Sequence, residues 1–155
     1  MKRLIIVNFL SIILMMACTT NGQTPTPQKL SQDIQSLPSN TIISVISLET
    51  YAAPKGAEII EKAGLYETVD NIYDARGYNV VIPRNALVRG IYTNDGKQCT
   101  VTWKAIYLDK QHYNKNMGSF EVGKQSVPTI CDPIRGVFKG QRLLLHLNRA
   151  LAEPL

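Results

Sequence analysis

From Thr41 onward the sequence is a succession of short β-rich runs separated by turn residues, and this spacing constrains the fold most strongly. The run CTVTWKAIYL, residues 99–108, alternates, which predicts that Val101, Trp103, Ala105 and Tyr107 share one buried face. Near the end of the chain, Leu143, Leu145 and Leu147 alternate with Arg142, Leu144 and His146. About seven strands at this spacing predict a mainly β fold, a small antiparallel β-barrel or sandwich.

The connections between these runs contain one strong hairpin signal and at most one short helix. Asn94-Asp95-Gly96-Lys97 predicts a hairpin in which Gly96 takes a positive φ. The segment PKGAEIIEKAGL, residues 54–65, contains helix formers, and Gly56 and Gly64 limit any helix there to two turns at most. The stretch DKQHYNKNMGS, residues 109–119, has no periodicity and is predicted to be a long exposed loop.

The amino terminus has the pattern of a secretory signal. Lys2 and Arg3 precede an apolar run of about a dozen residues, which is too short to span a membrane. The run ends in Leu14-Met15-Met16-Ala17-Cys18, which is similar to a lipobox with Met15 where leucine is usual. We expect cleavage after residue 17 and acylation of Cys18 by several chains, palmitate among them; ordinary signal cleavage nearby is the alternative. Thr19 in place of aspartate favours the outer membrane of a Gram-negative cell, with the protein facing the periplasm.

The mature chain has room for one domain. Residues 1–17 form the predicted signal, residues 18–40 a lipidated cysteine with a flexible linker, residues 41–149 a single β-rich domain and residues 150–155 a tail. The net charge falls from +5 to +3 because Lys2 and Arg3 leave with the signal. The remaining bases are scattered among acidic residues, so no nucleic-acid partner is expected.

Cys99 and Cys131 are the two thiols that remain if Cys18 is acylated. In an oxidising periplasm this pair predicts one disulfide, worth about 3–4 kcal/mol in the chain-entropy model. A catalytic or metal-binding thiol is the alternative, although neither cysteine lies in a CxxC motif.

The sequence shows none of the common catalytic motifs. The sequence contains no GxSxG and no HExxH, and His112 and His146 are interpreted as surface or edge residues. Glu58 and Glu61 are interpreted as solvent charge. The seven tyrosines are expected to pack in the core and at its rim rather than to form a ligand cage. We therefore predict no enzyme, no cofactor and no metal site.

The run from Asn71 to Asp109 carries a family resemblance. Four motifs occur in a characteristic order, namely Ile72-Tyr73-Asp74, Val81-Ile82-Pro83-Arg84, Leu87-Val88-Arg89-Gly90-Ile91-Tyr92 and Val101-Thr102-Trp103. Together they resemble the TrbI-like β-barrel domain of conjugation and type IV secretion systems, over about 40 of the 138 mature residues. The resemblance implies a structural role in an outer-membrane core ring, with other core subunits as partners.

Within that run, four residues are candidates for shaping the barrel. Pro83 lacks the N–H of a β ladder and Asn85 tolerates the left-handed region, so the two predict a corner where the family has glycine. Gly90 predicts a point of close packing, and Trp103 belongs to the last motif. The chain departs from the family in its lipidated start, its short linker and the lack of a later apolar run that could cross a membrane, so a pore-forming role is not implied.

Two functional hypotheses follow from these observations. The first is an outer-membrane lipoprotein that acts as a structural subunit of a type IV secretion or conjugation core complex. The alternative is a stand-alone periplasmic binding or hydrolase-inhibitor lipoprotein that contacts its target through loops such as Asp109 to Ser119.

Overall fold

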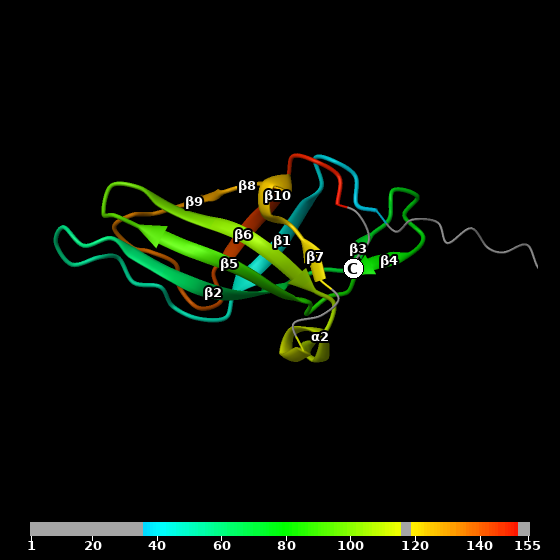
Figure 1. Ribbon diagram of the computed structural model, residues 1–155, viewed down its shortest axis with the longest axis horizontal. Helices are drawn as coiled ribbons and strands as arrows, with labels where there is room; N and C mark the ends of the chain where they lie inside the picture. The colour runs from blue at the N-terminus through cyan, green and yellow to red at the C-terminus, as the bar shows by residue number, and fades with distance from the viewer. Residues whose placement is uncertain (1–35, 116–118, 152–155) are drawn as a thin grey trace, which may run out of the picture. The chain divides into compact units, whose positions relative to one another are not determined.

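The structure, a computed structural model, describes residues 36–115 and 119–151, all within one compact unit that begins at Ile34. The predicted fold class is confirmed, because these residues form a mainly β, antiparallel half-barrel with one short α-helix (Figure 1). Its strands are β1 (Ile42–Ser47), β2 (Ile60–Thr68), β3 (Ile72–Tyr73), β4 (Val80–Ile82), β5 (Leu87–Asn94), β6 (Cys99–Tyr107), β7 (Ser119–Glu121), β8 (Ser126–Val127), β9 (Thr129–Cys131) and β10 (Arg142–Leu147).

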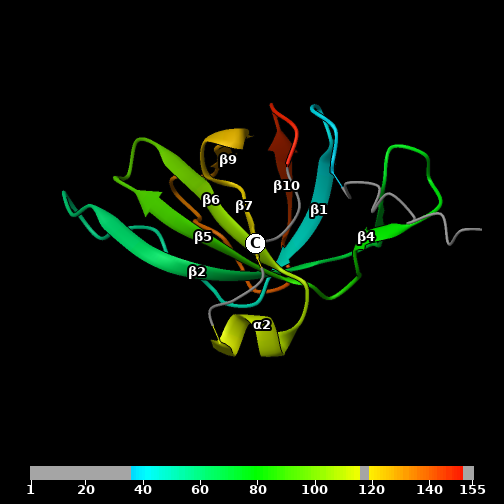
Figure 2. The same ribbon diagram turned by 45° about the vertical axis from the view of Figure 1, so that its right-hand side comes forward.

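The main sheet curls back on itself through one short segment of chain. Its order is β7-β6-β5-β2-β1-β10-β8, and β9 pairs with β6. Because β8 lies against β10 while β9 lies against β6, residues 126–131 bridge the two sides of the curled sheet (Figure 1; Figure 2 shows the sheet turned by 45°). Pro128 stands between β8 and β9, where the chain changes partner and no ladder N–H is needed. We call residues 126–131 the bridging segment.

The core fills the concave side of this sheet. In β10 the side chains of Leu143, Leu145 and Leu147 are buried and those of Arg142, Leu144 and His146 are exposed, as predicted. In β1 the alternation buries Ile43, Val45 and Ser47. The Asn94–Lys97 hairpin between β5 and β6 is also confirmed, with Gly96 at a φ of 82°.

The predicted alternation of β6 is correct only as far as Trp103. Val101 and Trp103 belong to the core, but the β5–β6 register shifts between Arg89 and Gly90, so that Gly90 pairs with Trp103 and Arg89 with Ala105. Beyond this bulge Ile106 takes the core position. Ala105 and Tyr107 are buried but lie outside the core cluster, on the face that carries the exposed Arg89. Placing them on the Trp103 face was therefore wrong, because a bulge reverses the faces of the strand.

The prediction of a short helix in residues 54–65 is also wrong. Residues 60–65 belong to β2, which pairs with β5 from Ile60 to Glu67, and this pairing outweighs the local helix preference of the segment. The α-helix α2 (Lys110–Lys115) instead occupies part of the predicted 109–119 loop. Asp109 caps it, because its carboxylate accepts a hydrogen bond from the backbone N–H of His112 at 2.8 Å. Tyr113 of α2 packs edge-on against Tyr107 of β6, with ring centroids 5.1 Å apart.

The two ends of the described chain meet beside β1 and β10. Leu37 and Leu151 exchange two backbone hydrogen bonds, at 3.1 and 2.9 Å, and both side chains are buried. Both residues lie just outside the predicted 41–149 domain, so the packed domain includes part of the predicted linker and of the predicted tail. The predicted signal, Cys18 and the linker up to residue 35 lie outside the described residues.

Candidate functional site

The chain turns sharply after β4, where the sequence places Pro83 and Asn85. Asn85 has a φ of 65°, in the left-handed region that asparagine tolerates. Thr68, at the end of β2, holds this turn from inside. Its carbonyl accepts the N–H of Asn85 at 2.9 Å, and its hydroxyl donates to the Pro83 carbonyl at 2.8 Å and accepts the N–H of Ala86 at 2.9 Å. The turn is therefore fixed by a buried threonine 15 residues earlier, which local patterns do not reveal.

Two glycines make room for aromatic rings on the concave face. Gly64 of β2 pairs with Gly90 of β5, and Gly90 pairs with Trp103 of β6. A Cβ at Gly90 would lie 3.0 Å from a methyl of Val101 and 3.3 Å from the Trp103 ring, and one at Gly64 would lie 2.7 Å from the Tyr66 ring. Tyr66 and Trp103 meet edge-on in the space thus left, with centroids 5.0 Å apart.

The bridging segment is tied to both sides of the sheet. The indole N–H of Trp103 donates to the hydroxyl of Thr129 at 2.9 Å, and that hydroxyl donates to the carbonyl of Leu144 at 2.6 Å. One side chain of β9 thus links β6 to β10. At the other end of β9, Cys99 and Cys131 form a disulfide between directly paired residues, with their Cα atoms 4.9 Å apart. We call Trp103, Thr129 and this disulfide the seam.

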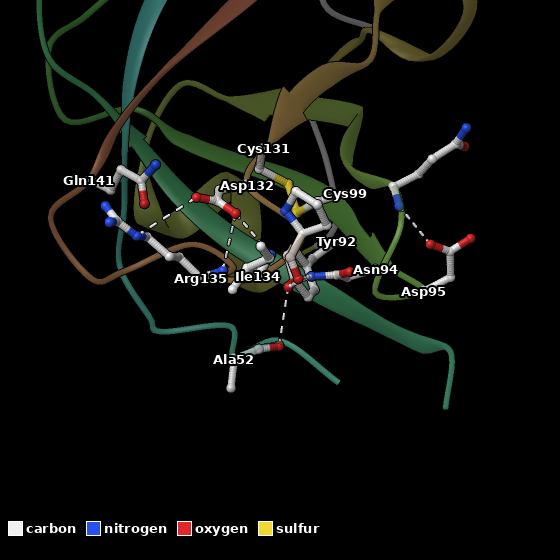
Figure 3. The surroundings of a disulfide bond; sticks show 12 residues. Ala52, Tyr92, Asn94, Asp95, Cys99, Cys131, Asp132, Ile134, Arg135 and Gln141 are labelled. Atoms are coloured by element: carbon white, nitrogen blue, oxygen red, sulfur yellow. Dashed lines mark hydrogen bonds and ion pairs between the residues drawn. A yellow bond between two sulfur atoms is a disulfide. The ribbon is translucent and has the colours of Figure 1, made fainter. Parts of the chain in front are cut away.

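A second polar cluster lies beyond the disulfide, at the end of the sheet that holds the β5–β6 hairpin (Figure 3). The buried amide of Asn94 donates to the Tyr92 hydroxyl at 2.8 Å and to the Pro133 carbonyl at 3.0 Å. Tyr92 in turn donates to the Ala52 carbonyl at 3.1 Å. These contacts join β5 to two loops that are distant in sequence, so Asn94 is a structural residue as well as a turn former.

The tyrosines of this region are buried, and burial shifts their protonation. Loss of hydration is the largest cause that raises the pKa of Tyr51 to about 12, while a hydrogen bond from the Leu65 N–H lowers it and the Glu49 carboxylate raises it. Loss of hydration also raises the pKa of Tyr66 strongly. Among the residues that the structure describes, the buried Tyr66 hydroxyl has no hydrogen-bond partner. Both hydroxyls are therefore protonated at neutral pH, and that of Tyr51 links the Leu65 N–H to the Glu49 carboxylate.

The other titratable candidates do not come together. His112 lies on α2 with its ring 2.7 Å from Asp109, while His146 is exposed on β10. Glu58 lies in an exposed connection and Glu61 is exposed on β2. Across residues 36–115 and 119–151, no three His, Cys, Asp or Glu side chains are placed to share a metal ion. No helix in the same ranges has the length and apolar character needed to span a membrane.

Comparison with known proteins gives a distant similarity to solved structures. No protein-family model matches the sequence, and no curated protein matches it. Among solved structures, the chain is similar to ComB10 of the Com type IV secretion system of Helicobacter pylori, with 9% identity over 78% of this chain and 88% of that chain and a TM-score of 0.39. At this identity and TM-score the similarity does not indicate a shared function.

Proposed function

We propose that the chain is an outer-membrane lipoprotein and a structural subunit of a type IV secretion or conjugation core complex. The observation that carries this proposal is the ordered set of motifs in residues 71–109, which resembles the TrbI-like barrel domain. Two positions in those motifs have a structural role in this chain. Asn85 takes a left-handed turn after Pro83, and Gly90 lies against Trp103.

The arrangement of polar groups supports a structural role for this protein more than a catalytic one. The side-chain hydrogen bonds of Thr68, Asn94 and Thr129 end on backbone groups or buried side chains that hold strands and loops together. A subunit of a large ring needs such a rigid domain, because its surface must keep one shape through assembly. In this proposal the outer surface of the half-barrel contacts neighbouring subunits, and acylated Cys18 holds the ring at the periplasmic side of the outer membrane.

Affinity purification of the full-length protein from solubilised outer membranes tests the proposal. We expect the tagged chain to co-purify with the subunits of a secretion core in one large particle. The matched control is Cys18→Ser, which keeps the domain intact and removes the acylation site, and it is expected to leave the outer-membrane fraction. A monomeric, partnerless protein in cells that assemble such a machine would contradict the proposal.

The alternative of a hydrolase inhibitor makes a different prediction in the same experiment, a one-to-one complex with a cell-wall hydrolase. The loop expected to make that contact is a helix in residues 110–115, and Tyr113 holds it against the sheet. No described contact favours this alternative.

A further inference from the structure

The β3–β4 hairpin carries an apolar face that the domain does not cover. Tyr73 and Val80 stand directly opposite each other across the two strands, so their side chains share one face. They are 47% and 41% exposed, and Tyr78 in the connecting loop is 83% exposed. On β4 the neighbouring residues Val81 and Ile82 are buried in the core. The hairpin therefore has one part fixed to the domain and one apolar part that faces outward.

The loop of this hairpin is held in shape by one carboxylate. Asp74 accepts hydrogen bonds from the N–H of Tyr78 at 3.1 Å and from the side-chain amide of Asn79 at 2.8 Å. Its own N–H donates to the Asn79 carbonyl at 2.9 Å. At the base of the hairpin, the N–H of Arg84 donates to the Asn71 side chain at 2.7 Å. Tyr78 is thus presented by an ordered loop, which lowers the entropy lost when it binds a surface.

The hairpin projects from the end of the domain at which the chain enters. In Figures 1 and 2 the β3–β4 pair lies at the same end as residues 36–41, while the β5–β6 hairpin lies at the other end. The disulfide belongs to that other end, because Cys99 is the first residue of β6 after this hairpin. The sequence predicts a flexible linker between Cys18 and this entry point, and a flexible chain of 17 residues would have a root-mean-square span of about 20–25 Å. A lipid on Cys18 therefore brings the hairpin end, more than the disulfide end, near the membrane.

From these observations we infer that the outward face of the β3–β4 hairpin lies in the interfacial region of the bilayer that holds Cys18. This inference rests on the proposed lipid anchor. Tyrosine suits that region because its ring is apolar and its hydroxyl stays in contact with water and headgroups. Arg84, which is exposed and follows β4, adds a positive charge that anionic headgroups attract. The domain then has a fixed orientation, with its disulfide end directed away from the membrane.

Quenching by brominated lipids tests this orientation. Because Cys99 and Cys131 are joined, Cys18 is the one free thiol of the mature chain, and it can be coupled to a maleimide lipid in phosphatidylethanolamine–phosphatidylglycerol vesicles. Two variants are compared with the unaltered chain, which contains the buried Trp103 alone. One is Tyr78→Trp on the hairpin, and the other is Ile134→Trp near the disulfide, at a position exposed to the same degree, 82% against 83%.

We expect brominated lipid to reduce the added fluorescence of Tyr78→Trp and to leave that of Ile134→Trp unchanged. Equal quenching of the two variants, or none in either, would overturn the inference, including the case in which the hairpin binds a protein instead. Chemical coupling makes this result independent of acylation in cells. The mass of the protein extracted from cells tests acylation separately, so failure of the anchor and failure of the hairpin contact give different results.

Discussion

The seam and the β3–β4 hairpin each include a short strand, β9 in the seam and β4 in the hairpin, but different interactions hold them. The seam joins segments that are distant in sequence through a disulfide and the buried Trp103, and Thr129 links them to a third strand. The hairpin is local, and one exposed aspartate holds its loop. We therefore expect the seam to resist unfolding more than the hairpin, whose exposed side chains face outward.

The largest expected effect comes from the disulfide. Replacement of both Cys99 and Cys131 by alanine removes a crosslink between residues 32 positions apart. This loss should lower the free energy of unfolding by about 3–4 kcal/mol, measured by urea denaturation. Cys18→Ser is the control and should leave the unfolding midpoint unchanged. A double variant as stable as the parent would show that the disulfide does not stabilise the domain.

Two glycine substitutions should have different effects, one on the stability of the whole domain and one on the hairpin alone. Gly90→Ala places a Cβ 3.0 Å from Val101 and 3.3 Å from the Thr102 carbonyl, so we expect a global loss of about 1–3 kcal/mol. Gly77→Ala in the hairpin loop meets no atom within 4 Å, but its φ is 76°, so a local cost of about 1 kcal/mol is expected. Urea denaturation should detect the first change, and NMR shifts confined to residues 72–82 should report the second. If both variants lowered the global stability, the hairpin and the seam would unfold as one cooperative unit.

Thr129 gives a finer test of the seam. Thr129→Val removes the acceptor of the Trp103 indole N–H, and the expected cost is about 1–2 kcal/mol because Thr129 is only half-buried. Thr100→Val is the matched control on the neighbouring strand, and its change should stay within about 0.5 kcal/mol. Both values come from the same denaturation assay, supported by a shift of the Trp103 emission in Thr129→Val alone.

Alkaline pH should weaken the core before it affects the hairpin. The pKa of Tyr51 is raised from 10.0 to about 12 in the folded protein, so folding favours its protonated form. The associated stability is complete below pH 10 and is lost as the pH rises through about 12. Trp103 fluorescence during an alkaline titration measures this, and Tyr51→Phe should reduce the transition. Tyr78→Phe, which alters an exposed position, should leave it unchanged.

The smallest effect is expected at acid pH, in the hairpin. The pKa of Asp74 lies below its ordinary value of 3.8, chiefly because the Asn79 side chain donates a hydrogen bond to the carboxylate. A depressed pKa contributes stability above 3.8, which is lost as the pH falls through the lower folded value. NMR shifts of Tyr78 and Asn79 should therefore change at a pH where the Trp103 signal is still native. Asp74→Asn should abolish that pH response, and simultaneous change at Trp103 would contradict local opening.

Local patterns predicted those parts of the fold that local physics determines. Strict alternation identified β10, and Asn94-Asp95-Gly96-Lys97 identified the β5–β6 turn, because each signal lies within a few adjacent residues. The position of β2 was missed because Glu61 and Lys62 favour a helix in isolation, and only pairing with β5 makes that segment a strand. The Asp109 cap of α2 was visible in the sequence, since aspartate before a polar run is a helix-start signal.

The candidate site was harder to predict because its partners are remote. The Cys99–Cys131 pairing followed from the number of cysteines, but that count does not indicate that the disulfide joins β6 to β9. Thr68 and Thr129 act through contacts 15 and 26 residues away, at Pro83 and Trp103. The register shift near Gly90 also depends on a neighbouring strand, so the face reversal after Trp103 has no signature in β6 itself.

The pairing of Leu37 with Leu151 has a mechanical consequence. Any pull on the amino-terminal side of the chain reaches the domain first at this two-bond bridge, which holds neighbouring ends and can open one bond at a time. Force that passes beyond it acts along β1, which lies between β2 and β10 and is hydrogen-bonded to both. This strand can leave the sheet only after its hydrogen bonds to both neighbours break. We therefore expect this bridge to open before the sheet does when the linker is pulled.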